Sequence, residues 1–198
     1  MNLLTLCVIG YIVGSIPTGF LLAKFGSGID LRNFGSHSVG ATNVLRTGNK
    51  KQAALTLLID ATKGILFSLF VKLFVCNPYA LVAVFFCIIG HVYPIWLSFK
   101  GGKGVATSAG IFLTLSPGFA LVSIIIWALT AKITRVSSLA SILLSVSFTV
   151  LTLYGYIVGD AKLDVLLFAI GTLFFLLYTH LDNIKRLINK EEEAVAIK

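Results

Sequence analysis

Long apolar stretches, separated by short polar segments, dominate the chain. They cover residues 3–23, 53–75, 79–99, 104–132, 137–158 and 163–179. Within each stretch the apolar residues are continuous and do not alternate with polar ones, which is typical of buried helices and not of barrel strands. Five of the six stretches are close to the ~20 residues that a helix needs to cross a membrane. The pattern therefore predicts an all-α integral membrane protein.

The fourth stretch is the longest, and Ser116, Pro117 and Gly118 interrupt it near its middle. It can form one long kinked helix or a hairpin of two short helices, 104–116 and 118–132, because proline removes a backbone donor and glycine relaxes the chain. With the amino end outside, a hairpin places 13 lysines and arginines on the cytoplasmic side and 2 outside, whereas a single helix divides them almost evenly. We therefore expect about seven transmembrane helical segments, two of them short, with the N-terminus outside and the C-terminus cytoplasmic.

Composition agrees with this class. Of the 198 residues, 57% are hydrophobic and 12% are charged, and a soluble chain of this length cannot bury so much apolar surface within itself. The net charge of +8 indicates lysines and arginines in cytoplasmic loops, and attraction for anionic lipid or phosphate. We expect no nucleic-acid partner, because the sequence has no basic helix or other nucleic-acid motif. The predicted organisation is a single membrane domain over residues 1–198.

The first long polar segment, GIDLRNFGSHSVGATNVLRTGNKK, covers residues 28–51. Ser36, Thr42 and Asn43 supply small hydrogen-bonding groups, and the glycines around them let backbone amides approach a ligand. Arg46 suits a phosphate because its planar guanidinium donates two parallel hydrogen bonds. The alternative is a flexible, solvated loop that carries cytoplasmic positive charge.

A second glycine-rich segment, FKGGKGVATSAG, opens the fourth apolar stretch at residues 99–110. Glycines surround Lys103, Thr107 follows one turn later, and a helix start adds a positive dipole, so the segment is a candidate phosphate cradle. It is not the nucleotide P-loop, because GxxxxGK[ST] is absent. The alternative is a turn at the membrane interface with lysines that extend to water.

Two further segments fall on the predicted cytoplasmic side. Arg135 comes just before the serines of RVSSLAS, including Ser138, which can equally cap and pack a helix. His180 and Asn183 lie three residues apart and so share a helix face. A histidine is the usual general base near neutral pH, although a single histidine at an interface can also be purely structural.

Charged residues also occur inside the apolar stretches. Asp60 and Lys63 are spaced i, i+3 on one predicted helix, and such costly charges should pair or line a polar interior. They fit a structural clamp, or a relay in a transporter. We interpret His91 as an aromatic residue at the interface and not as a group that supports the site. The three histidines are dispersed and no HExxH, CxxC or DxD spacing occurs, so we expect no metal and no cofactor.

Six motifs in order carry a resemblance to a known family. They are GSIPTG at 14–19, GSHSVGATNVLR at 35–46, LLIDATKG at 57–64, GHVYPIWLSFKGGKGVAT at 90–107, RVSSLAS at 135–141 and HLDNIKRL at 180–187. With these motifs, the chain resembles the bacterial inner-membrane glycerol-3-phosphate acyltransferases that take their acyl group from acyl-phosphate. The resemblance runs nearly end to end.

The resemblance implies that acyl-phosphate and glycerol 3-phosphate react to give 1-acyl-glycerol 3-phosphate (lysophosphatidate) and phosphate, in phospholipid biosynthesis. It implies no metal and no thioester as direct donor, and an active site on the cytoplasmic side of the inner membrane. The HxxxxD motif of other glycerolipid acyltransferases is absent. We expect the protein to be surrounded by membrane lipid and to be a monomer.

Residue roles follow from the same resemblance. Catalytic roles fall to Ser36, Arg46, His180 and Asn183. Substrate binding falls to the glycine loop, Gly101, Gly102, Lys103 and Gly104, and a structural role to Glu192, although Lys190 stands where the family has a glycine. From the residues themselves we add Thr42, Asn43, Thr107, Arg135 and Ser138 as candidates for substrate binding, and Asp60 and Lys63 as a structural pair. The first loop departs as well: GSHS replaces the family's GSGN, so His37 stands in place of a glycine.

A small transporter or flippase for a phosphorylated metabolite is the competing class. It would use the Asp60–Lys63 pair and the basic loops. The sequence has no long internal repeat, and nearly all of its polar chemistry falls on one predicted face, which favours the enzyme.

Overall fold

The computed structural model describes residues 2–75 and 79–194, and over that part it is helical without any strand. The predicted all-α class is therefore confirmed. The described chain forms two compact units, one within residues 2–110 and the other Ile111–Ala194. The single domain over residues 1–198 stays a prediction, and it includes residues 1, 76–78 and 195–198, which lie outside the described part.

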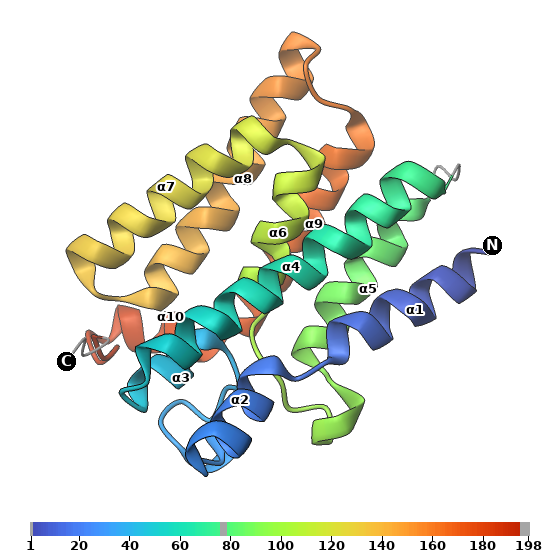
Figure 1. Ribbon diagram of the computed structural model, residues 1–198. Helices are drawn as coiled ribbons and strands as arrows, with labels where there is room; N and C mark the ends of the chain where they lie inside the picture. The colour runs from blue at the N-terminus through green and yellow to red at the C-terminus, as the bar shows by residue number, and fades with distance from the viewer. Residues whose placement is uncertain (1, 76–78, 195–198) are drawn as a thin grey trace. The chain divides into compact units, whose positions relative to one another are not determined.

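Over its described residues, the first unit contains four longer helices and several short ones. Its elements are α1 (Leu3–Ser15), α2 (Thr18–Ser27), η1 (Leu31–Asn33), α3 (Ala41–Arg46), α4 (Lys50–Phe74), α5 (Ala80–Val92) and η2 (Ile95–Leu97). α1 and α5 run side by side, and α4 packs against both (Figure 1). Glycines allow the close approach of α1 and α5: a Cβ on Gly14 would overlap the Cys87 carbonyl. Small residues at such contacts let helix backbones approach each other in a membrane.

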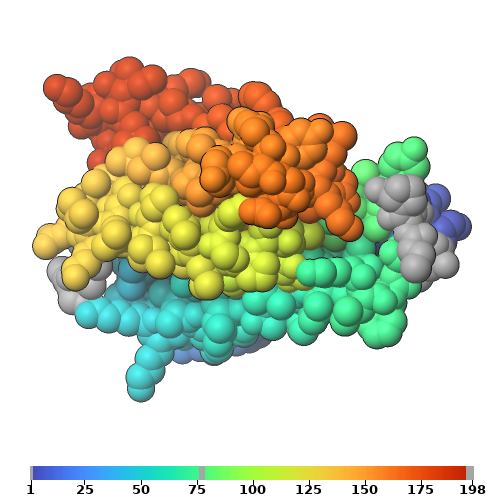
Figure 2. Space-filling model, turned by 90° about the horizontal axis from the view of Figure 1, so that it is seen from above, coloured from blue at the N-terminus to red at the C-terminus, as the bar shows by residue number. Residues whose placement is uncertain are grey.

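The second unit consists of three long helices followed by one short helix. Its elements are α7 (Pro117–Thr134), α8 (Ser137–Val158), α9 (Leu163–Thr179) and α10 (Leu181–Ile188), while α6 (Val105–Leu115) begins in the first unit and ends in the second. α7 packs along α8, as Figure 2 shows, and α8 packs on α9. The Phe112 and Phe148 rings stack with centroids 3.8 Å apart, and Phe168 meets Phe112 edge-on at 6.4 Å. These rings form the centre of the unit.

Large apolar side chains face outward along the helices. Leu4, Phe74, Ile133 and Ile157 are each more than 70% exposed, which suits lipid as the surrounding solvent. Among the described residues, five helical segments are long and apolar enough to cross a membrane, namely the pair α1–α2, then α4, α5 extended through η2, α7 and α8. A sixth exists if α9 and α10, bent by 65° at their junction, count as one span.

The break in the longest apolar stretch is confirmed. α6 ends at Leu115 and α7 begins at Pro117, so Ser116 separates them. Proline is favourable at the first position of a helix, where its missing N–H is not needed. Only α6 is short, however: α7 has 18 residues, because it continues to Thr134 and ends where Arg135 adopts a left-handed φ of 58°. The sidedness of both ends of the chain stays a prediction.

Candidate active site

The first polar loop is ordered by a buried asparagine. Asn43 is 1% exposed, and its Nδ2 donates to the carbonyls of Leu31, Phe34 and Ser38 at 3.3, 2.9 and 2.8 Å. Its Oδ1 accepts the Ser36 backbone N–H at 3.1 Å. One side chain therefore holds the loop at four points. We predict the Asn43 amide to bind substrate, but in the structure it binds backbone groups of its own loop.

A small hydrophobic cluster also anchors this loop. It consists of the buried residues Ala23, Leu31, Val39, Val44, Ala53 and Leu97. Burial of these apolar side chains beneath the loop stabilises one conformation. The base of the loop is therefore packed, while Ser36 and His37 at its tip are exposed; its role as a phosphate site stays a prediction.

Ser36 lies at the tip of a tight turn in this loop. Gly35 and His37 both have left-handed backbones, with φ of 56° and 59°. This conformation is costly for a residue other than glycine, and the His37 ring supports it with a contact of 2.8 Å between Nδ1 and the Arg32 carbonyl. The loop thus makes the left-handed turn without the family's glycine. Ser36 is exposed there, and a Cβ on Gly35 would lie 3.4 Å from Cδ of the half-buried Arg46.

The glycine-rich loop lies on the end of α5. The N–H groups of Gly101 and Gly102 donate to the carbonyls of Val92 and His91 at 3.0 and 3.1 Å. These two amides are therefore paired within the protein, and the glycines serve close backbone packing. The Gly101 carbonyl in turn accepts the Val39 N–H at 3.4 Å. This bond joins the first polar loop to the glycine loop, as the phosphate-site hypothesis requires of these two segments.

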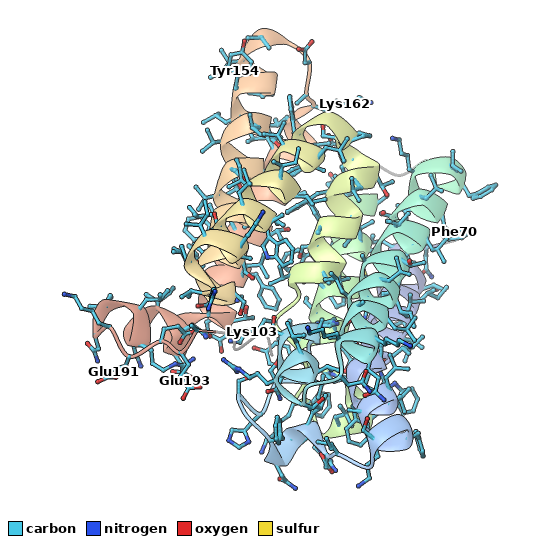
Figure 3. The ribbon with its side chains drawn as sticks, turned by 60° about the vertical axis from the view of Figure 1, so that its left-hand side comes forward. Phe70, Lys103, Tyr154, Lys162, Glu191 and Glu193 are labelled. Carbon is cyan, nitrogen blue, oxygen red and sulfur yellow. The ribbon has the colours of Figure 1, made fainter. Side chains whose placement is uncertain are left out.

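Helix α6 starts directly after this loop. Gly104 has φ of 89°, and its carbonyl accepts the Ser108 N–H at 2.8 Å, so the helix begins at that point. The N–H groups of a first turn have no partner within the helix and can bind an anion. The hydroxyls of Thr107 and Ser108 are buried and lack a hydrogen-bond partner among the described residues. Lys103 is half-buried, and in the view of Figure 3 it lies lower in the first unit than Phe70.

The buried charges of the first unit form a cluster. Lys63 Nζ lies 2.8 Å from Asp60 Oδ1, so the expected pairing is confirmed. The same Nζ lies 2.9 Å from His91 Nδ1, and His91 is 7% exposed. Our interpretation of His91 as an aromatic residue at the interface is therefore wrong. Only the motif at 90–107, which runs from this histidine into the glycine loop, hinted at the connection.

In the second unit, the Glu192 carboxylate accepts hydrogen bonds from three side chains. Ser138 Oγ and Asn183 Nδ2 donate to its Oε1 at 2.7 and 2.6 Å, and Arg186 Nε donates to its Oε2 at 2.6 Å. Burial acts to raise the pKa of Glu192, but the hydrogen bonds from Asn183, Ser138 and Arg186 outweigh it and leave the pKa below its ordinary value. The carboxylate thereby joins the start of α8 to α10. Sequence reasoning did not identify Arg186 as a partner.

His180 lies at the bend between α9 and α10 and is 2% exposed. Its Nδ1 is 2.8 Å from the Leu176 carbonyl, which can only accept, so the Nδ1 carries the proton. In the neutral ring Nε2 then holds the lone pair that a general base needs. Asn183 follows on the first turn of α10 and is 6% exposed, while Arg135 is exposed at the end of α7. Glu191 and Glu193 lie at the same end of this unit, opposite Tyr154 and Lys162 (Figure 3).

Comparisons with known proteins agree with one another. A family model described as Glycerol-3-phosphate acyltransferase matches residues 4–190. Proteins of that name from Pelagibacter ubique (strain HTCC1062) and Agrobacterium fabrum are 43% and 41% identical, over 100% and 96% of this chain and 100% and 91% of theirs. The crystal structure of PlsY (YgiH), an integral membrane glycerol 3-phosphate acyltransferase, in its glycerol 3-phosphate form has a TM-score of 0.88 at 38% identity, covering 98% of this chain and 96% of that one. The chain belongs to the glycerol-3-phosphate acyltransferase family and is an integral membrane acyltransferase.

Proposed function

We propose that this acyltransferase uses acyl-phosphate as its donor and acylates the sn-1 hydroxyl of glycerol 3-phosphate. The hydroxyl oxygen forms a bond to the acyl carbon, the bond from that carbon to the phosphate oxygen breaks, and inorganic phosphate leaves. The hydroxyl proton passes to a base, and the product is 1-acyl-glycerol 3-phosphate. Acyl-phosphate is a mixed anhydride with a good leaving group, so the reaction needs no covalent enzyme intermediate.

The joined loops of the first unit carry this proposal. The hydrogen bond from Val39 to Gly101 connects the loop of Ser36 and Arg46 with the loop of Lys103. Both substrates are phosphate anions, and fixed cations and helix-start amides offset their mutual repulsion. The Thr107 hydroxyl, which is buried and has no hydrogen-bond partner within residues 2–75 and 79–194, adds a donor one turn into α6.

Related structures support the choice of substrate and product. PlsY (YgiH) has been solved in a glycerol 3-phosphate form and in a lysphosphatidic acid form, and the second resembles this chain with a TM-score of 0.86 at 36% identity. We assign the phosphate of glycerol 3-phosphate to the glycine loop and Lys103, as the resemblance of GHVYPIWLSFKGGKGVAT at 90–107 to the family implies. Ser36 and Arg46 act in catalysis, with Thr42 and Asn43 supporting their loop.

His180 is the proposed acceptor of the hydroxyl proton, with Asn183 beside it to orient the substrate. The tautomer that Leu176 selects supports this role, because it leaves the lone pair on Nε2. A phosphate oxygen of the substrate is the rival base. We expect His180→Gln to lose about a hundredfold or more in kcat and to lose the limb of the pH profile that reports histidine ionisation. Substantial activity with an unchanged profile would assign the proton to the substrate.

The donor is tested with purified protein in detergent. Long-chain acyl-phosphate should release phosphate and form lysophosphatidate only when glycerol 3-phosphate is also present. Acyl-coenzyme A and acyl-carrier protein, supplied separately, should give no product. Turnover with a thioester and none with acyl-phosphate would overturn the donor assignment, and product in which the acyl group is on the sn-2 oxygen would overturn the regiochemistry.

The proposed setting is the bacterial inner membrane, with the active site on the cytoplasmic side, where a soluble and a lipid substrate can both reach it. The exposed apolar helices and the similarity to PlsY (YgiH), an integral membrane glycerol 3-phosphate acyltransferase, support a membrane location. We further propose that the enzyme acts as a monomer. Light scattering of the active detergent complex should give the mass of one 21.3 kDa chain after subtraction of detergent, and a larger protein mass would contradict this.

A further inference from the structure

Three buried ionisable side chains meet beneath the glycine loop. Asp60 and Lys63 come from α4 and His91 from α5, and they are 2%, 7% and 7% exposed. Lys63 Nζ is the centre of the cluster, at 2.8 Å from Asp60 Oδ1, 2.9 Å from His91 Nδ1 and 3.2 Å from the Ile16 carbonyl. Lys63 Nζ donates hydrogen bonds to His91 Nδ1 and the Ile16 carbonyl, and it forms an ion pair with the Asp60 carboxylate.

The contacts with Lys63 determine where the His91 ring carries its proton. A lysine ammonium only donates, so His91 Nδ1 must accept. The neutral imidazole then has its hydrogen on Nε2. Asp60 Oδ1 is 3.6 Å from Nδ1, which is too far for a hydrogen bond. Lys63 therefore fixes both the tautomer and the orientation of the ring.

The Nε2 end of that ring points at Gly102. A Cβ on Gly102 would overlap Nε2 and would lie 2.9 Å from both Cδ2 and Cε1, so the ring presents its Nε2 corner to the glycine. Gly102 is not among the glycines with positive φ. Glycine is thus needed at this position because the His91 ring fills the space of a side chain.

The backbone of α5 holds the loop from the same side. The His91 carbonyl accepts the Gly102 N–H, and the Val92 carbonyl accepts the Gly101 N–H. His91 therefore contacts the loop twice, through its carbonyl and through its ring. Gly102 in turn directly precedes Lys103, so a shift of the ring would move the lysine.

Burial of charges in a membrane protein is costly, and an apolar cluster of the same volume would be cheaper. A role in fixing the loop explains why charged residues occupy this place. We propose that Asp60, Lys63 and His91 form a positioning unit that sets the Gly101–Gly104 loop, and with it Lys103, in the geometry that binds glycerol 3-phosphate. This inference rests on the proposed assignment of that loop to the glycerol 3-phosphate phosphate.

A double-mutant cycle tests the contact, with glycerol 3-phosphate binding measured by calorimetry on purified protein in detergent. Gly102→Ala should weaken binding about tenfold, because its methyl group displaces the loop from the ring. His91→Ala should weaken it by a similar factor, because the loop loses its support. The double variant should bind no more than about twofold more weakly than the worse single variant, since the methyl group enters the space that the ring leaves. Losses that multiply, or wild-type binding by His91→Ala, would overturn the proposal.

The charges are tested with the neutral pair Asp60→Asn and Lys63→Met, combined in one chain so that no unpaired charge remains. We expect a raised KM for glycerol 3-phosphate, an almost unchanged KM for the acyl donor, and a kcat per folded molecule within about threefold of wild type. A purely structural role would instead reduce the folded fraction and leave both KM values unchanged. That result would overturn the proposal.

Controls separate this inference from the proposed function. Gly118→Ala adds a methyl group where nothing lies within 4 Å and should bind like wild type. Binding is measured without any acyl donor, so it does not depend on the identity of that donor. If Lys103→Ala binds glycerol 3-phosphate like the wild type, the loop assignment fails; if only the His91 and Gly102 variants bind normally, the positioning role fails.

Discussion

At the scale of single residues, the candidate residues of the two units include some whose chemistry the sequence identifies and others whose role depends on contacts that the sequence does not show. Lys103 and His180 stand out as types, because a lysine among glycines suits an anion and a histidine can act as a base near neutral pH, although each also has a structural alternative. Asn43 and His91 do not, because their importance lies in partners. The Asn43 amide binds four backbone groups of its own loop, and His91 meets Lys63 from another helix. No spacing rule predicts such contacts.

Substitution of Lys103 gives the most direct test of the proposed phosphate site. We expect Lys103→Ala to raise the KM for glycerol 3-phosphate about tenfold to a hundredfold, because the phosphate loses a charge-assisted hydrogen bond. The change in KM for the acyl donor should be smaller. Lys100→Ala is the matched control, since Lys100 is an exposed lysine of the same loop, and its kinetics should resemble wild type. An unaltered KM in Lys103→Ala would remove this residue from the binding site.

Glu192 gives a pH-dependent prediction. Its folded-state pKa is below the ordinary value, so the ionised carboxylate stabilises the fold at a pH above the unfolded value of about 4.3. That stabilisation is lost as the pH falls through the lowered pKa. The melting temperature of Glu192→Gln should therefore lie below wild type at neutral pH, and the two should converge as the pH falls through the lowered pKa of Glu192. A gap between the two melting temperatures that is constant over this range would contradict the carboxylate's role.

At the scale of elements, hydropathy predicted the bounds of those helices whose ends coincide with a change from apolar to polar residues. The stretches 137–158 and 163–179 coincide with α8 and α9, because polar turns bound both. The stretch 3–23 was instead divided into α1 and α2 at Pro17, although its hydropathy continues through the break. Hydropathy measures preference for lipid and says nothing of backbone dihedral angles. The break between α1 and α2 could therefore not be predicted from it.

The close approach of the α1 and α5 backbones depends on glycine, which has no side chain, at position 14. Gly14→Ala should destabilise the protein by about 1–3 kcal/mol, because its Cβ would overlap the Cys87 carbonyl and force the two backbones apart. Thermal unfolding in detergent measures this change. Gly171→Ala, at a helical position where nothing lies within 4 Å of the added carbon, should melt within about a degree or two of wild type. Equal effects of the two substitutions would exclude close packing as the cause.

At the scale of the whole molecule, the distribution of positive charge predicts which parts face the cytoplasm. Lys162 and Lys190 are both exposed and are predicted on opposite sides of the membrane. In a chain without its native cysteines, a cysteine at 162 should react with a membrane-impermeant maleimide in intact cells. A cysteine at 190 should react only after the membrane is permeabilised. The reverse pattern would show that the positive-inside rule fails here.

The anchoring of Glu192 also limits how far the protein can be shortened. A truncated chain that ends at Glu192 keeps the carboxylate and its bonds to Ser138, Asn183 and Arg186. A chain that ends one residue earlier leaves all three donors without their acceptor. Tags and fusion partners should therefore follow Glu192 only after a flexible spacer, or be attached at the other terminus.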